Sequence, residues 1–269
     1  MTTNLPALPP IPKAPANASE KTLLVLEAVL IHDRFTDVVE ATGLAKATVH
    51  RILMTLADRE FVTVSATGGY LPGPKVLSLA GRALQRIDIS AIAQPYVDAL
   101  VAQVHCTVHL GAANGDEILY LIRSDSDKPY RMISRVGNSI PMHTTGIGKC
   151  VLANYNDEAL ALFVARAGLP RKTEHTITDL EGLRAEVQTV RDLGYARDRE
   201  ENEPGIGCVA APVRDHTGKV NYGVSISTIM LDHTPAEIDA MSVDAINTAN
   251  QISRALGYKP PTDRNTPPE

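Results

Sequence analysis

The sequence predicts an α+β protein in which an N-terminal winged helix-turn-helix is followed by a linker helix and a larger domain with an antiparallel sheet and packed helices. Three observations support this. Helical apolar spacing dominates residues 19–60. A Thr-Gly-Gly turn then separates two short strand-like segments, and two longer strand pairs flank glycine turns near residues 115 and 218. Strand pairs combined with helices between them are typical of α+β domains.

Composition sets the broad class. The chain has 269 residues, enough for two ordinary domains, and 44% are hydrophobic, so a sizeable core can form. A net charge of -5 argues against binding nucleic acid by bulk positive charge, but it leaves room for one small DNA-binding module. Three widely spaced cysteines indicate a reducing cytoplasm, and no signal peptide or membrane-length apolar run is found. We therefore expect a cytoplasmic protein with no membrane partner.

Composition shifts and turns divide the chain into segments. We expect disordered tails over residues 1–18 and 258–269, a winged helix-turn-helix over 19–73, a linker helix over 74–88 and a sheet domain over 89–257. Pro74 sits in the first turn of the linker helix, where proline is tolerated. We expect the helical pattern that follows to be interrupted before Pro95.

The first module contains candidate DNA-binding residues. Ser19 and Thr36 are candidate N-caps of its first two helices, and Gly43 ends the second. The third helix has an apolar face formed by Val49, Ile52, Leu53 and Leu56. The polar side chains that fall largely elsewhere on it include Lys46, Thr48, His50 and Arg51. In a winged helix-turn-helix this third helix enters the DNA major groove, so these four are the candidates.

An alternative for this module is a helical domain whose charges simply face water. Over residues 19–82, seven lysines and arginines equal seven acids, so the positive field is weak. The order of the elements nevertheless favours DNA binding.

The stretch HTTGIGKCVLA, residues 143–153, places a Gly-Ile-Gly turn before an apolar run. It does not fit a nucleotide-binding Walker loop, because His143 stands where the first glycine is needed and Cys150 where a hydroxyl should hold magnesium. If Thr145 or Gly146 begins a helix, its unpaired backbone N–H groups attract an anion. We expect His143 to orient this loop.

Four segments, in order, carry a resemblance to a known family: ATGLAKATVHRILMTL, PMHTTGIGKCVLA, GYARDREENEPGIGCVAAPVRD and GVSIS. They resemble the IclR family of bacterial transcriptional regulators, from about residue 19 to 256. The resemblance implies a ligand-responsive DNA-binding regulator, expected to be a repressor, with a GAF-like effector-binding domain over 89–257. It also implies a homodimer or homotetramer on a palindromic double-stranded DNA operator, with no cofactor and no enzymatic activity.

The same resemblance implies an effector pocket. The family's positions fall on Met132, Ile140, Gly146, Ile147, Asp198, Cys208, Ser225 and Ser227. Ile147 replaces the small residue that is usual there. The two serines are two apart on a strand and point to one face, where both hydroxyls can reach one carboxylate. We therefore expect a small organic acid, and Asp198 favours a hydroxy acid because two carboxylates repel.

Three alternatives remain open at this point. A cysteine or serine hydrolase acting on a small acid derivative would use Cys208, Ser225 and His143, although no base can be assigned to the thiol. A sensor could bind ligand and a protein partner without DNA. In a strand, His105 and His109 would share a face as two zinc ligands, but no third ligand is apparent, so we expect no metal.

Overall fold

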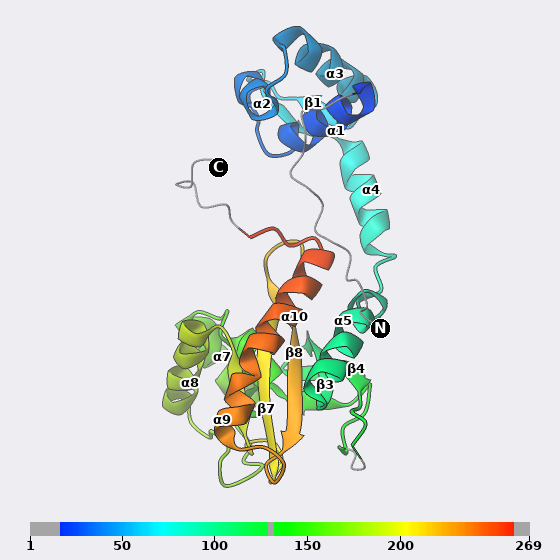
Figure 1. The fold of residues 1–269 in the computed structure, drawn as a ribbon. Helices are drawn as coiled ribbons and strands as arrows, with labels where there is room; N and C mark the ends of the chain where they lie inside the picture. The colour runs from blue at the N-terminus through cyan, green and yellow to red at the C-terminus, as the bar shows by residue number, and fades with distance from the viewer. Residues whose placement is uncertain (1–16, 129–131, 261–269) are drawn as a thin grey trace. The chain divides into compact units, whose positions relative to one another are not determined.

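The structure is a computed structural model that describes residues 17–128 and 132–260. The chain forms two compact units, one ending at Ile87 and the other beginning at Asp88 (Figure 1). Most of the two predicted tails lies outside the described residues. No described helix has the length and apolar character needed to span a membrane.

The described part of the first unit packs three helices and a hairpin around an aliphatic core. The helices are α1 (Ala18–Val29), α2 (Phe35–Thr42) and α3 (Lys46–Asp58), and the hairpin strands are β1 (Val62–Val64) and β2 (Tyr70–Pro72). The apolar face predicted for α3 is confirmed: Val49, Ile52, Leu53 and Leu56 are buried. Gly43 has φ +63° and ends α2, a left-handed conformation that favours glycine.

The predicted caps of the first two helices are wrong. Asn17 caps α1, because its side chain accepts from the Glu20 amide while the Glu20 carboxylate accepts from the Asn17 amide. This reciprocal capping box satisfies two backbone donors at once, so the helix begins before Ser19. In α2 the N-cap is Arg34, and Thr36 lies inside the first turn.

The linker region also differs from its prediction at one point. Helix α4 (Pro74–Leu84) ends before α5 (Ile89–Val104), which Asp88 caps by accepting from the amides of Ser90 and Ala91. The predicted interruption before Pro95 is found at residues 85–88, and Pro95 itself lies within α5. Proline removes one helical hydrogen bond, and the burial of the α5 residues Ala93, Val97 and Leu100 offsets that loss.

The second unit is built on an antiparallel sheet. Its six described strands lie in the order β5-β4-β3-β8-β7-β6. They are β3 (Thr107–Asn114), β4 (Glu117–Ser124), β5 (Ser139–Pro141), β6 (Ala196–Arg199), β7 (Ile206–Arg214) and β8 (Val220–Ile229). Both predicted hairpins, β3–β4 and β7–β8, are confirmed, with Gly115 and Gly218 at positive φ in their turns.

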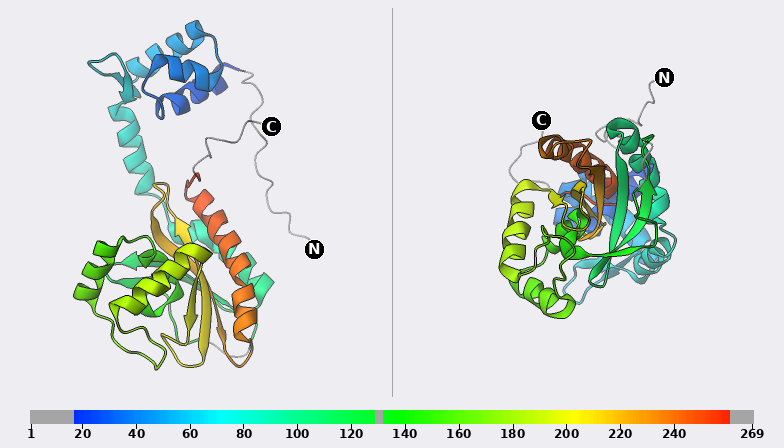
Figure 2. Two further views of the ribbon diagram at one scale, coloured as in Figure 1. Left: turned by 90° about the vertical axis from the view of Figure 1, so that its left-hand side faces the viewer. Right: turned by 90° about the horizontal axis from the view of Figure 1, so that it is seen from below.

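Helices cover both faces of the sheet, as the left view of Figure 2 shows. On one face, α5 and α10 (Ser242–Ala255) cover an aliphatic core that includes Val108, Leu110, Val224 and Ile226, with α9 (Pro235–Ala240) beside it. The other face carries the short turn η1 (Met142–Thr144) and the helices α6 (Gly146–Leu152), α7 (Asp157–Ala167) and α8 (Leu180–Leu193). The second face is polar where these helices leave it uncovered, and the candidate site lies there.

Candidate functional site

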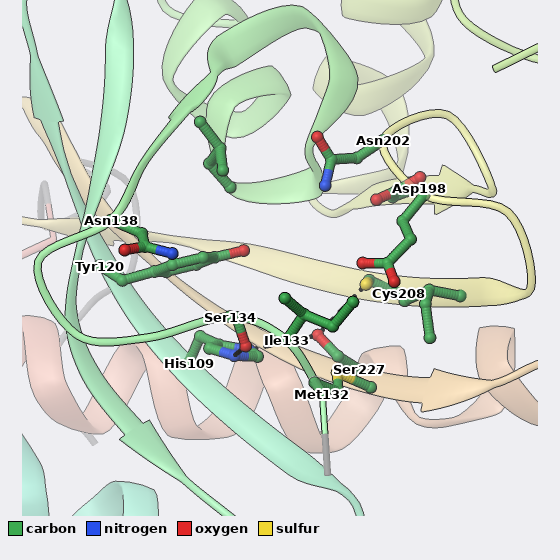
Figure 3. A pocket seen from close by; sticks show the side chains of 13 residues that line it. His109, Tyr120, Met132, Ile133, Ser134, Asn138, Asp198, Asn202, Cys208 and Ser227 are labelled. Atoms are coloured by element: carbon green, nitrogen blue, oxygen red, sulfur yellow. Dashed lines mark hydrogen bonds between the residues drawn. The ribbon is translucent and has the colours of Figure 1, made fainter. Parts of the chain in front are cut away.

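A cavity of about 180 Å³ lies on the sheet face that carries α6 (Figure 3). It is smaller than the pockets of about 300–1,000 Å³ that hold drug-sized ligands, so it suits a small metabolite. Sheet residues form its floor, and residues from the segments 132–140 and 202–203 line it as well. Its lining residues are His109, Tyr120, Met132, Ile133, Ser134, Asn138, Ile140, Asp198, Asn202, Glu203, Ile206, Cys208 and Ser227.

Five of the eight predicted effector residues line this cavity: Met132, Ile140, Asp198, Cys208 and Ser227. The other three, Gly146, Ile147 and Ser225, do not. Ile147 packs over Gly111 and Gly223 of the sheet, where a Cβ atom would meet its side chain. Gly146 packs against Ala210 in the same way. The Gly-Ile-Gly turn is therefore packed against the sheet, and the part of these three residues in effector binding stays a prediction.

Ser225 and Ser227 lie on the same face of the sheet, as their spacing predicts. The strand register gives them different neighbours. Ser227 lies opposite Cys208, and both line the cavity. Ser225 lies opposite His109 and Ala210, one pair closer to the part of the sheet under α6. Both serines are buried, so neither is a solvent-facing strand residue.

A chain of hydrogen bonds ties the cavity floor to the loop above it. The Cys208 thiol donates to the Ser227 Oγ at 3.2 Å, and that hydroxyl lies 3.3 Å from Nδ1 of His109. The other ring nitrogen of His109, Nε2, lies 2.8 Å from the Ser134 Oγ. The imidazole also stacks on Tyr120, with ring centroids 4.6 Å apart. Burial lowers the pKa of His109 to about 4, so the ring is neutral near pH 7 and uses both nitrogens as hydrogen-bonding groups.

The predicted common face of His105 and His109 does not exist. Strand β3 begins at Thr107, and His105 is the left-handed C-cap of α5, where its side chain faces Asp127 at 3.5 Å. Both nitrogens of His109 are already engaged. Within residues 17–128 and 132–260, no three histidine, cysteine or acidic side chains are grouped as a metal site requires.

A buried ionic cluster lies directly behind the cavity wall. Lys149 of α6 is fully buried, and its Nζ lies 2.6 Å from Glu201 and 2.9 Å from Glu186 of α8. Burial alone would lower the pKa of Lys149, but the two carboxylates outweigh it and raise the pKa, so the ammonium stays charged. The second oxygen of Glu201, Oε2, has no hydrogen-bond partner among the described residues.

Asp198 joins this cluster to the cavity. Its side chain is 5% exposed and accepts a hydrogen bond from the Glu201 amide at 2.8 Å. Burial raises the pKa of Asp198 to about 7, and the negative charge of Glu201 adds to the rise while Lys149 opposes it. Asp198 thus changes its charge near neutral pH at the edge of the cavity.

The groups proposed for a hydrolase do not come together. Cys208 lines the cavity, whereas Ser225 and His143 do not. The Nε2 of His143 lies 3.1 Å from the Pro170 carbonyl, and its part in orienting the loop stays a prediction. Burial raises the pKa of the Cys208 thiol far above its usual range and that of Cys150 to about 12. Thiols that stay protonated are poor nucleophiles.

The first unit presents a second surface of interest on α3. Lys46, His50 and Arg51 are exposed, and Thr48 is half-buried. The His50 ring lies nearly perpendicular to the Phe35 ring of α2, with ring centroids 6.3 Å apart. This contact holds the His50 side chain against α2. Ala47 and Met54 continue this exposed stripe. Exposed apolar side chains in such a position can contact thymine methyl groups.

Comparison with known domains identifies both units. A model of the C-terminal domain of the bacterial transcriptional regulator IclR matches residues 81–254, and a model of the IclR helix-turn-helix domain matches residues 18–65. The chain belongs to the IclR family. This IclR-family chain is a DNA-binding transcriptional regulator of the ligand-responsive kind and not an enzyme, as the sequence predicted. The hydrolase alternative is without support.

Individual relatives cover most of the chain. The HTH-type transcriptional regulator KdgR of Escherichia coli (strain K12) is 33% identical over 224 residues, which span 83% of this chain and 85% of KdgR. The HTH-type transcriptional repressor AllR of Salmonella typhi is 29% identical over 250 residues, or 91% of this chain and 92% of AllR. The crystal structure of the Thermotoga maritima IclR aligns with a TM-score of 0.61 and 30% identity, covering 89% of this chain and 98% of that chain.

The buried cluster generates a stability prediction. Lys149→Met leaves Glu186 and Glu201 without their buried partner, so we expect the free energy of unfolding to fall by about 3–5 kcal/mol. Urea denaturation of the full chain measures this. Arg166→Met breaks the ion pair with Asp116 at an Arg166 side chain that is 61% exposed, and it should cost far less. The double variant Lys149→Met, Glu201→Gln should regain part of the loss. If Lys149→Met and Arg166→Met lowered the free energy of unfolding by the same amount, this role of Lys149 would be contradicted.

Proposed function

We propose that this IclR-family regulator is a repressor that binds a palindromic operator as a homodimer or a dimer of dimers, and that a small organic acid controls that binding. The observation that carries the proposal is the combination of a winged helix-turn-helix with an exposed polar α3 and a separate cavity of small-metabolite size on one chain. The repressor assignment is supported by the relative AllR, which is named a repressor. The same role places the protein in the cytoplasm, with the operator DNA.

The DNA-reading residues in this proposal are Lys46, Thr48, His50 and Arg51. The apolar face of α3 is buried against the rest of the unit, so the opposite, exposed face is the one free to enter a groove. Lys46 and Arg51 supply positive charge for phosphates or guanine edges, and Thr48 and His50 supply shorter hydrogen-bonding groups.

The effector site in this proposal is the cavity around Asp198, Cys208 and Ser227. Hydroxyl and amide groups from Tyr120, Asn138, Asn202 and Ser227 surround it, and Met132, Ile133, Ile140 and Ile206 supply its apolar wall. In Figure 3 the Tyr120 hydroxyl points across the cavity toward the side where Asp198 and Cys208 lie. Many hydrogen-bonding groups around a small volume favour a polar ligand with both a carboxylate and a hydroxyl group.

Helix α4 supports the homodimer. Its apolar residues Leu77, Ala80 and Leu84, with Ile87 beyond its end, follow the a and d spacing of a coiled coil. Leu77 is 68% exposed and Leu84 is 47% exposed, and none of the α4 residues is buried. An exposed heptad stripe of this kind is covered when two copies of the helix pair, and a two-fold symmetric dimer matches a palindromic operator.

The DNA assignment predicts a charge effect at Arg51, in the N-terminal half of α3. Arg51→Ala should weaken binding to DNA taken from upstream of the protein's own gene and reduce the slope of log affinity against log salt by about one if Arg51 contacts a phosphate. Fluorescence anisotropy with scrambled competitor DNA measures both. Arg59→Ala, which removes the same charge at the C-terminal end of α3, is the matched control and should have the smaller effect. Indistinguishable salt slopes for wild type and Arg51→Ala would reject the phosphate contact.

The effector assignment predicts a difference between the two strand serines. Ser227→Ala removes a hydroxyl from the cavity and should weaken binding of a small hydroxy acid about fivefold to tenfold. Ser225→Ala, a matched change outside the cavity lining, should have little effect. Calorimetric titration with glycolate, lactate, glycerate and gluconate provides the test, and the acid that binds should also change operator affinity by the factor by which operator changes acid affinity. An effect of Ser225→Ala as large as that of Ser227→Ala would place the effector elsewhere.

The dimer assignment predicts face-specific effects on α4. Leu84→Glu puts a charge into the proposed helix seam and should shift the full chain toward smaller assemblies in light scattering at low concentration. Leu79→Glu introduces the same charge on the same helix, but position 79 lies outside the a and d stripe, and Leu79 is 45% exposed. The proposal fails if both variants keep the mass of the wild type, or if both lose it equally.

A further inference from the structure

The cavity is unusual for an acid-binding site because its charged lining residues are acidic. Among the described residues that line it, Asp198 and Glu203 are the carboxylates, and no lysine or arginine is present. His109 is neutral near pH 7 because burial lowers its pKa to about 4. Burial keeps Tyr120 and Cys208 protonated as well. An anionic effector would therefore meet negative charge in this wall without an opposing cation.

The cations that act electrostatically on Asp198 and His109 already have partners. Lys149 lies behind Asp198 and is held by Glu186 and Glu201. Arg123 donates to the Ser134 carbonyl and forms an ion pair with Asp125 at 2.8 Å. Neither side chain can neutralise an added carboxylate without leaving a carboxylate partner.

The outer side of Asp198 offers no better compensation. A second cavity of about 250 Å³ also touches Asp198 and Cys208, and its charged or titratable lining residues include His175, Arg197, Arg199, Glu200 and Asp239. Arg197 is paired with Asp239 and lies over the Tyr195 ring. Arg199 is exposed, so water screens its charge.

Asp198 is the group best placed to resolve this repulsion. It lies at the edge of the cavity, is 5% exposed, and is held by the backbone amide of Glu201. Glu201 from the following loop adds negative charge beside Asp198, and Glu203 from the same loop also lines the cavity. A second anion inside the cavity favours the protonated form of Asp198, and a protonated carboxyl can donate a hydrogen bond to that anion.

We propose that this regulator binds a small carboxylic acid together with one proton from solvent, which Asp198 takes up and then shares with the carboxylate of the acid through a hydrogen bond. The inference rests on the proposed effector function and adds to it a proton as a co-ligand. The acid arrives as the anion, and the one bond that forms is the O–H bond of protonated Asp198, whose proton comes from solvent. The bound anion and the proton cancel, so the net charge of the occupied cavity is the same as that of the empty one.

Proton uptake has a definite pH dependence. Burial raises the pKa of Asp198 to about 7 in the empty cavity, and the bound anion raises it further. Below that pKa the proton is already present, so affinity is nearly independent of pH. Above it each bound acid must draw a proton from solvent, and affinity should fall by up to about tenfold per pH unit until the pKa of the complex is reached.

Calorimetry of the full chain tests this directly. Glycolate, lactate, glycerate and gluconate are titrated between about pH 6 and about pH 8.5, in pairs of buffers with different ionisation enthalpies, which report the number of protons taken up. We expect uptake to rise toward one proton per acid at the alkaline end. Lactamide, which carries no charge, is the matched ligand and should bind with no uptake.

Two variants separate Asp198 from the other carboxylate of the cavity. Asp198→Asn cannot titrate, so it should bind the acid without proton uptake and without the loss of affinity at high pH. Glu203→Gln keeps Asp198 and should retain the uptake. Circular dichroism checks that each variant folds. If Asp198→Asn does not fold, the test is the wild type alone: its binding enthalpy must depend on the buffer and its affinity for the acid must depend on pH.

The outcomes separate the two levels of inference. If none of the four acids binds at any pH, the proposed effector class is wrong, and the proton inference falls with it. If an acid binds with no proton uptake, or if Asp198→Asn keeps the same pH slope, the effector class stands and the proton inference is overturned.

Discussion

The second unit depends on the burial of one charged side chain. Lys149 extends from α6, a helix that is buried along its whole length, and meets carboxylates from α8 and from the loop between β6 and β7. Three elements are therefore positioned by one ammonium group. Because an unpaired buried charge is very costly, the cluster fixes where the loop that carries Glu201 must lie. That loop in turn sets the position of Asp198 and of one wall of the cavity.

Close packing of α6 explains the glycines in the stretch of residues 143–153. Gly146 faces Ala210, and a side chain at Gly148 would overlap the Met142 carbonyl. Ile147 occupies the space left by two sheet glycines, Gly111 and Gly223. The turn brings a helix into contact with the sheet, and the ligand-sized space lies beyond it. Thr145 caps this helix by accepting from the Gly148 amide, which satisfies a donor that an anion would otherwise need.

Sequence patterns predicted the fold well because its hairpins and amphipathic helices each form from residues that are close together in the sequence. Glycine turns defined both hairpins, and three- and four-residue spacing defined the buried face of α3. The two-residue period correctly placed Ser225 and Ser227 on one face. It could not tell which serine lines the cavity, because that depends on how much of the sheet a helix far away in sequence covers.

The residues that the sequence did not reveal belong to long-range pairings. His109 reaches Ser227 only because β3 pairs with β8, 118 residues away along the chain. Ser134 and Asn138 lie in a segment with no regular spacing, so nothing marked them in advance. Asn202 and Glu203 are ordinary loop residues by composition. Family resemblance supplied five cavity residues; strand pairing and the segments 133–138 and 202–203 supplied the rest.

The exposed connection between α4 and α5 has a consequence for how such proteins diversify. Every residue from Gly81 to Asp88 is exposed, and the chain leaves one cooperative core before it enters the next. Within one chain this segment packs on neither core, so it tolerates a change of sequence on either side as long as the a and d positions of α4 are kept. Recombination of the gene at this point can therefore join one effector-binding unit to a different DNA-binding unit. The new protein would couple a different operator to the same effector, and neither hydrophobic core would need to change.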